Sequence, residues 1–253
     1  MREAVELHRR THGEHHPLTL NVKQGLGLAL LRQGKGADAE PLFRDVYETR
    51  KTKKSNDPDT IDAAFSLAEA LQNQGRSEDA LPFYGVAWEG RKNLPKRDMT
   101  RLKTLNFYAS ALADAHHPDQ AEPLARELLA TFKAMMPPGH QSISGAQSLL
   151  GGALVDLGKA EEAELLLREC LAAREKSLPK GGWQVALARV RLGACLAALG
   201  KFQEAEPLML QGEKEIAADK TAPPNRLNEV KTRLVALYVK WGKPAEAEKW
   251  KKQ

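Results

Sequence analysis

The sequence predicts an all-α protein, a right-handed α-solenoid built from antiparallel helical hairpins. Three observations carry this prediction. A turn motif recurs at a nearly constant spacing, the segment before each turn has apolar residues at helical spacing, and Ala and Leu dominate the apolar composition. Runs of β-branched residues, which are typical of strands, are missing from the sequence.

The recurring turn opens with Gly-Lys or a close variant and ends with Ala. Its copies start at Gly34, Gly75, His116, Gly158, Gly200 and Gly242, so successive starts lie 41, 41, 42, 42 and 42 residues apart. Glycine suits this place because the residue that follows a helix often adopts a left-handed conformation. His116 replaces glycine in the third copy, and histidine tolerates that conformation better than most residues.

Apolar residues on both sides of each turn predict two helices per repeat. Leu or Tyr lies eight residues before each turn, and a small residue follows it in five of the six copies, which indicates one buried face of a first helix. The alanine that closes the motif lies early in a second helix. We expect first helices at 17–33, 58–74, 99–115, 141–157, 183–199 and 224–241, and second helices at 36–54, 77–94, 118–135, 160–177 and 202–219.

These helices are expected to form one array, residues 1–253, without a second domain. Residues 2–13 match the end of a preceding repeat, and residues 224–253 form a terminal, capping repeat that turns polar at its end. The full repeats between them are expected at 17–57, 58–98, 99–140, 141–182 and 183–223.

The charge and hydropathy of the chain exclude some classes of protein. A net charge of +5 and a pI of about 9.1 are mildly basic, and many cations fall late in second helices, where they complement the helix dipole. No stretch approaches the 18 apolar residues that suggest a membrane span, and the N-terminus has no apolar signal core. We therefore expect a cytoplasmic protein.

No residue pattern predicts catalysis, a cofactor or a metal site. Phosphate-binding loops, nucleophile elbows and zinc-binding helix motifs are missing from the sequence. His12, His15 and His16 are interpreted as variants of a linker, because zinc needs three or four convergent ligands. Cys170 and Cys195 fall at core positions, where cysteine packs as a small apolar residue. The expectation is a protein that is not an enzyme.

The motif Leu-Gly, Leu, Gly-Lys and Glu-Ala resembles the tetratricopeptide repeat. The standard repeat has 34 residues, whereas the period of 41–42 resembles the longer repeats of kinesin light chains. The linker at 13–17 (Gly-Glu-His-His-Pro) and the Ala-Glu-Pro-Leu opening at 39–42 are also similar to that family. The ending at 241–250 resembles the C-terminal arrays attached to bacterial serine/threonine protein kinases.

The resemblance implies binding on a concave face, which the first helices line in that family. The groove positions carried across are Asn21, Gln24, Arg32, Phe65, Ser66, Glu69, Asn73, Asn106, Phe107, Ser110, Arg191 and Arg233. Kinesin-light-chain repeats often carry paired asparagines that grip an extended peptide backbone. Asn106 alone remains of that ladder here, so the groove either has lost peptide binding or reads a different ligand.

Two pairs of side chains stand out among these positions. Phe65 and Phe107 fall where we expect solvent exposure, so they could anchor a ligand side chain, or alternatively they fill contacts between adjacent helices. Arg191 and Arg233 occupy equivalent positions one repeat apart. They could bind a carboxylate or phosphate bidentately, or alternatively pair locally on a solvated face.

The resemblance therefore predicts a non-catalytic protein-interaction scaffold that binds a peptide or partner protein. One alternative is a nucleic-acid-binding helical array, motivated by the pI but less favoured by the modest charge. The other is a self-association module of a larger signalling protein, with a homodimer that covers the N-terminal half-hairpin. No cofactor and no metal is expected.

Overall fold

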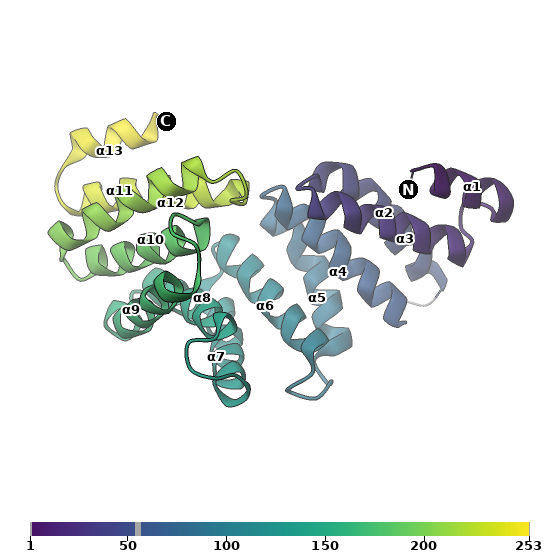
Figure 1. The fold of residues 1–253 in the computed structure, drawn as a ribbon, viewed down its shortest axis with the longest axis horizontal. Coiled ribbons are helices and arrows are strands. Elements are labelled where there is room, and N and C mark those ends of the chain that lie inside the picture. Colours follow the sequence, from purple (N-terminus) through teal and green to yellow (C-terminus); the bar gives the residue numbers. More distant parts are fainter. Residues whose placement is uncertain (1, 54–56, 253) are drawn as a thin grey trace. The chain divides into compact units, whose positions relative to one another are not determined.

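The computed structural model describes residues 2–53 and 57–252, and within these ranges every regular element is an α-helix. Figure 1 shows that, within each of two units, consecutive helices run antiparallel and pack on one another. Residues 54–56, at the expected end of the first full repeat and of its second helix, lie outside the described residues, as does residue 253 of the terminal repeat.

The helix bounds agree with the predicted bounds to within three residues at each described end, and the all-α prediction is confirmed. In chain order the helices are α1 (Arg2–His12), α2 (Pro17–Arg32), α3 (Gly36–Lys53), α4 (Pro58–Asn73), α5 (Ser77–Arg91), α6 (Met99–Asp114), α7 (Pro118–Met135), α8 (Gln141–Asp156), α9 (Ala160–Ser177), α10 (Trp183–Ala198), α11 (Phe202–Ala218), α12 (Pro224–Lys240) and α13 (Pro244–Lys251).

The helices group into two compact units, Met1–Ala115 and His116–Gln253. In the first unit each of the helices α1 to α6 packs on the next, and the first helices α2, α4 and α6 also contact one another in turn. In the second unit α7 to α13 pack in the same way, with α8, α10 and α12 in turn contact. The division of the chain into individual repeats stays a prediction.

The small residue in the first helix allows the second helix of the same hairpin to approach closely. A Cβ atom added at Gly27 would lie 2.6 Å from the Phe43 ring, and one at Gly193 would lie 2.4 Å from Met209 Cγ. Both distances are far below a normal contact, so a larger residue would push the helices apart. Cys170 and Cys195 are fully buried, as predicted for core positions.

The turns between the paired helices adopt the left-handed conformation that the sequence predicts. The φ angles of Gly34, Gly75, Gly158, Gly200 and Gly242 lie between 72° and 78°. His116 has a φ of 63°, so the histidine that replaces glycine also adopts the left-handed conformation.

A ladder of ion pairs joins the second helix of one repeat to the turn of the next repeat. In the first unit, the Glu40 carboxylate binds Arg44 at 2.8 Å and Arg76 at 2.7 Å. The equivalent rungs of the second unit join Glu122 to Lys159 at 2.7 Å and Glu164 to Lys201 at 2.9 Å. Because the cations are about half exposed, each rung contributes less than about 1 kcal/mol to stability.

Candidate functional site

In the first unit, the amides of Asn21 and Gln24 on α2 are occupied by an arginine from α3. Arg50 donates to Asn21 Oδ1 at 2.6 Å and to Gln24 Oε1, and it also donates to the backbone oxygen of Asp59 at the start of α4. Arg50 therefore fastens α2 to α4, and these two amides are held in contacts within the chain.

Arginines at the equivalent place of later second helices form similar bridges. Arg91 on α5 donates to Thr104 on α6 at 2.7 Å and also binds Asp62, and Arg174 on α9 donates to the backbone oxygen of Gln184 on α10 at 2.6 Å. The sequence explained such late cations by the helix dipole alone. The structure adds that they hold the first helix of the following repeat.

The expectation that Phe65 is exposed is wrong. Phe65 is 4% exposed, and its ring makes edge contacts with Tyr84 of α5 and Phe107 of α6 at centroid distances of 5.6 Å and 5.4 Å. Phe107 is half-buried. Phe65 thus fills the contact between adjacent helices, the alternative that the sequence left open, and Phe107 is the ring that reaches the surface.

Lys103 and Glu69 cover this aromatic cluster. The Lys103 ammonium lies 4.5 Å from the centre of the Phe65 ring and 5.5 Å from that of Phe107, a geometry for cation–π attraction. It also lies 3.6 Å from Glu69. Burial raises the pKa of the Glu69 carboxyl, and the Lys103 charge offsets part of that rise. Sequence reasoning missed Lys103, although it lies four residues before Phe107.

The remaining predicted groove residues of this unit differ in accessibility. Ser66 is buried and donates to the backbone oxygen of Asp62, so it faces no solvent. Ser110 lies 3.5 Å from the Gln72 amide, Asn73 is half-buried, and Arg32 is exposed. The half-buried Asn106 amide makes no hydrogen bond with any residue that the structure describes, which leaves its donor and acceptor available to a ligand.

In the second unit, Arg191 of α10 and Arg233 of α12 converge on one carboxylate. Glu229 of α12 accepts from Arg191 Nε at 3.1 Å, from Arg233 Nε at 3.3 Å and from Arg226 at 2.9 Å. Arg233 also forms a two-point pair with Asp156 of α8, at 3.1 and 3.2 Å. The two arginines therefore satisfy the local-pairing alternative and together join α8, α10 and α12.

This arginine network is poorly solvated. Arg191 is 8% exposed and also donates to the Ser148 backbone oxygen at 3.0 Å. Burial alone would raise the pKa of Glu229, but Arg191, Arg226 and Arg233 outweigh it and hold that pKa well below its usual range. The network has more positive than negative charge close to Arg174. Burial lowers the pKa of Arg174, and the nearby Arg191 and Arg226 lower it further.

Sequence reasoning missed Glu229 and Arg226. Their signal was present in the spacing, since Glu229 lies three residues after Arg226 and four before Arg233 on one helix, where such pairs meet. The link from Glu229 to Arg191 spans 38 residues, and no local pattern reveals it.

Three histidines, two on α1 and one just before α2, have their rings in contact. The rings of His8 and His12 lie 5.5 Å apart between centroids, and those of His12 and His16 lie 4.9 Å apart. His16 Nδ1 accepts a hydrogen bond from the Leu18 backbone and so caps α2. Among the described residues, no group of three or more His, Cys, Asp or Glu side chains is arranged to hold a metal ion.

Comparisons with known proteins agree with this architecture. Models of the tetratricopeptide repeat match residues 1–52, 62–84 and 145–181. No curated protein matches the sequence significantly. In the part of the chain that the structure describes, no helix is both long and apolar enough to cross a membrane.

Several solved structures share the fold. A kinesin-light-chain-like repeat protein of Podosopora anserina is 23% identical with a TM-score of 0.61, and the match covers 81% of this chain and 99% of that one. BtubC (BKLC) of P. vanneervenii is 22% identical with a TM-score of 0.61, covering 86% and 88%. A Rap protein in complex with competence and sporulation factor is 15% identical with a TM-score of 0.60, covering 99% and 82%.

The chain contains tetratricopeptide repeats in the three matched segments, and its fold is similar to that of solved kinesin-light-chain-like repeat proteins. Its fold is typical of protein-interaction scaffolds, which are generally non-catalytic.

Proposed function

We propose that this protein is a non-catalytic cytoplasmic scaffold that binds a peptide or a partner protein along its first helices. The observation that carries the proposal is the surface of α6 around Asn106. The Asn106 amide makes no hydrogen bond with a described residue, and the same helix carries the half-buried Phe107 ring and the exposed Lys103 ammonium. An amide can bind the backbone of an extended peptide through both its donor and its acceptor. An aromatic side chain next to it supplies apolar contact area.

The first helices of the second unit offer a different chemistry. Arg233 is held by Asp156, the most exposed member of the network, and an acidic ligand group could take the place of that carboxylate. The Rap structure with competence and sporulation factor supports ligand binding by this fold. The link to a bacterial kinase stays a prediction from the sequence.

A peptide-display selection tests the proposal. Peptides enriched on the wild-type protein should lose at least about tenfold in affinity for the Asn106→Ala, Phe107→Ala variant, because those side chains would form the centre of the contact. Arg126→Ala, on the exposed side of a second helix, is the control. Selected peptides that bind both variants like wild type would contradict the proposed surface.

The structure also changes the choice of test for the arginine pair. Replacing Arg191 and Arg233 with alanine would remove two partners of a buried carboxylate, so lost binding could reflect lost folding. Asp156→Asn is the sharper variant, since it frees Arg233 and should strengthen the binding of acidic peptides.

Self-association is a second candidate, favoured by the exposed apolar side chains of the N-terminal half-hairpin. No residue of α1 is buried, Leu7 is 62% exposed and Leu18 on α2 is 46% exposed. A second copy that packs against α1 would cover both. Light scattering should then show a dimer that Leu7→Glu converts to a monomer, whereas a wild-type monomer at high concentration would remove this candidate.

A further inference from the structure

Three second helices carry an arginine at the same place, 16 residues after the glycine of their hairpin turn. These arginines are Arg50 of α3, Arg91 of α5 and Arg174 of α9, which follow Gly34, Gly75 and Gly158. Each of them donates a hydrogen bond to the first helix of the following hairpin. The three arginines therefore share one half of their contacts.

In the first unit the arginine also binds a side chain of the first helix of its own hairpin. Arg50 Nη2 donates to Asn21 Oδ1 at 2.6 Å, and Arg91 Nη2 donates to the Asp62 carboxylate. Asn21 and Asp62 occupy equivalent places, 13 residues before the turn glycine. The two full hairpins that lack the arginine also lack an oxygen acceptor at that place; their residue pairs are Lys103 with Phe132 and Leu187 with Ile216. The arginine and its acceptor thus form one paired feature of the hairpin.

The hairpin of α8 and α9 keeps the arginine but lacks the acceptor. The residue 13 positions before Gly158 is Gly145. Arg174 donates to the backbone oxygen of Gln184 at 2.6 Å, and no carboxylate of the described residues forms an ion pair with it. A Cβ atom added at Gly145 would meet no neighbour within 4 Å. The place that Asp62 fills beside Arg91 is therefore open beside Arg174.

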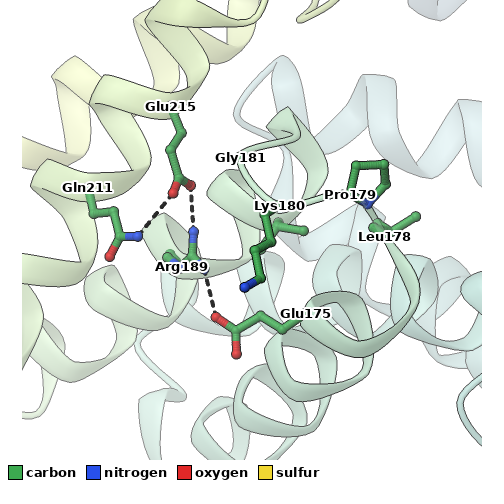
Figure 2. A pocket seen from close by; sticks show the side chains of 9 residues that line it. Glu175, Leu178, Pro179, Lys180, Gly181, Arg189, Gln211 and Glu215 are labelled. Carbon is green, nitrogen blue, oxygen red and sulfur yellow. Dashed lines mark hydrogen bonds and ion pairs between the residues drawn. The ribbon is translucent and has the colours of Figure 1, made fainter.

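The carboxylates closest to Arg174 along α9 are engaged elsewhere. Glu175, the next residue, forms an ion pair with Arg189 at 2.7 Å (Figure 2). Glu169 accepts a hydrogen bond from the Gln147 amide at 2.7 Å. Neither of them takes over the role that Asp62 has in the first unit.

The surroundings of Arg174 are buried and cationic. Arg174 is 8% exposed, and after burial the nearby charges of Arg191 and Arg226 also lower its pKa. Both of these arginines bind the Glu229 carboxylate, at 3.1 Å and 2.9 Å, so that acid is already shared. A buried cation without a carboxylate partner is costly, and an anion beside it would offset that cost.

The open place can be reached from solvent. The equivalent Asp62 side chain is 55% exposed although its partner Arg91 is only 9% exposed. Gly145 is half-buried. A group that enters at Gly145 would thus approach the buried guanidinium as the Asp62 carboxylate approaches Arg91.

We propose that Arg174 and the open place at Gly145 bind one carboxylate group of a ligand, in the position that Asp62 takes beside Arg91. A guanidinium presents N–H donors in a planar fork that matches a carboxylate. The carboxylate belongs either to an acidic side chain of a bound peptide or to a free small carboxylic acid, since both offer the same contact. The site lies on α8 and α9 and does not depend on the surface around Asn106.

Acetate tests the site itself. In an NMR titration at constant ionic strength, sodium acetate replaces sodium chloride. The Arg174 Nε–Hε resonance and the Gly145 amide resonance should shift and then saturate. A single charge-assisted contact gives weak binding, with a Kd of roughly 1–100 mM. Acetamide has a similar shape but no charge, and it should leave both resonances unchanged.

A variant can supply the missing carboxylate from the chain itself. Gly145→Asp should abolish the acetate-dependent shift of Arg174 and raise the midpoint of thermal unfolding by about 3 °C, because it restores the pair that Arg91 has. Gly145→Asn, which copies Asn21, should also abolish the shift without a change in net charge. The matched control is Gly85→Asp on α5, another helical glycine whose added Cβ would meet nothing within 4 Å. It should leave the acetate shifts unchanged and should not raise the midpoint.

Peptides selected on the wild-type protein identify the source of the carboxylate. If an acidic side chain supplies it, replacing that Asp or Glu of the peptide with Asn or Gln should weaken binding to the wild type about tenfold. The same replacement should change binding to Gly145→Asp less than about twofold. If acetate binds and no selected peptide depends on Gly145, the site belongs to a free carboxylic acid. Failure of the proposed function would leave acetate binding intact.

Three results would overturn the proposal. They are no acetate-dependent shift of Arg174 up to about 200 mM, equal shifts with acetate and acetamide, and the same acetate shifts in Gly145→Asp as in the wild type. Unchanged or lower stability of Gly145→Asp relative to Gly85→Asp would also contradict it, because a carboxylate at this place would then not pair with Arg174.

Discussion

The two units place different chemistry at the same position of the first helix. In the first unit that position holds Gly25, Ser66 and Phe107, and the contact around Phe107 is built from aromatic rings beneath one lysine. In the second unit it holds Leu149, Arg191 and Arg233, and the contact is a charged network around Glu229. A residue at a predicted groove position can therefore be engaged in the contact between neighbouring helices and not in binding a ligand.

The comparison extends to the buried acids of the two surfaces. The Glu69 carboxyl has a raised pKa because burial outweighs its one cation, whereas the Glu229 carboxyl has a lowered pKa because three arginines outweigh burial. In the first unit the contact between helices is apolar, and Lys103 only partly offsets the cost of burying the Glu69 carboxylate. In the second unit the contact is cationic, and three arginines stabilise the charged Glu229 carboxylate. Three predictions test this contrast, and a fourth compares the starts of two first helices.

The largest effect is expected from Phe65→Ala. It removes a buried ring that contacts Tyr84 and Phe107, and it should destabilise the first unit by about 4 kcal/mol. Hydrogen exchange in α4 and α6 measures the loss within that unit. Leu28→Ala, a partly exposed apolar residue on α2, is the control and should cost less than about 0.5 kcal/mol. A similar loss of stability in both variants would contradict the view that the Phe65 ring contacts stabilise the first unit.

Glu229→Ala should be almost as damaging in the second unit. It leaves Arg191, Arg226 and part of Arg233 without their shared carboxylate, at a cost of about 3 kcal/mol. The double variant with Arg191→Met should recover part of that loss, because it removes one unpaired buried cation. Urea unfolding measures both. A double variant less stable than Glu229→Ala would contradict the view that surplus positive charge is what costs stability.

Low pH should destabilise the second unit more than the first. Glu229 has a lowered pKa in the folded protein, so its contribution is present above the ordinary glutamate pKa of 4.5 and is lost as the pH falls below that value. Glu69 has a raised pKa, so protonation below it relieves a burial cost and favours folding. Between pH 6 and pH 3, exchange protection should fall further in α12 than in α4. Glu229→Gln should reduce the pH dependence in α12, and an unchanged pH dependence in that variant would contradict the assignment.

The smallest effect concerns the starts of the first helices. Asp98 caps α6 by accepting from the Arg101 backbone at 2.9 Å. The N-cap residue of α10, Gly182, has no side chain to do so, and Asp219 accepts from the Trp183 backbone there at 2.9 Å. Asp98→Ala should cost about 1 kcal/mol, and Gly182→Asp should gain a few tenths of a kcal/mol. Thermal unfolding should show a lower midpoint for Asp98→Ala and a slightly higher midpoint for Gly182→Asp. A loss on Gly182→Asp would mean that this loop needs glycine for another reason.

The fold could be predicted because its causes are local and repeated. A left-handed turn after each first helix and a small residue such as Gly27 or Gly193 facing a large one can be recognised in the order of residues. The period then places every helix. The all-α prediction rested on these features, and the structure agrees with it.

The candidate site could be predicted by position but not by accessibility. Whether Phe65 is exposed depends on Tyr84 and Phe107, which come from other helices, and whether Arg191 is free depends on Glu229 38 residues later. The amides of Asn21 and Gln24 are engaged by Arg50, which the sequence explained as a dipole effect. Such pairings join different helices, within one hairpin for Arg50 and between neighbouring hairpins for Arg191, and the pattern along a single helix does not reveal them.

The ion-pair ladder determines what a change in the number of hairpins would do to the ion pairs between them. Each rung joins an acid of one second helix to the cation of the following turn, so the segment of α8 and α9 contributes Lys159 to one rung and Glu164 to the next. Copying or excising one such unit in the gene would leave every remaining acid beside a cation. An array with one such hairpin more or fewer would therefore keep the pairing and the direction of these rungs.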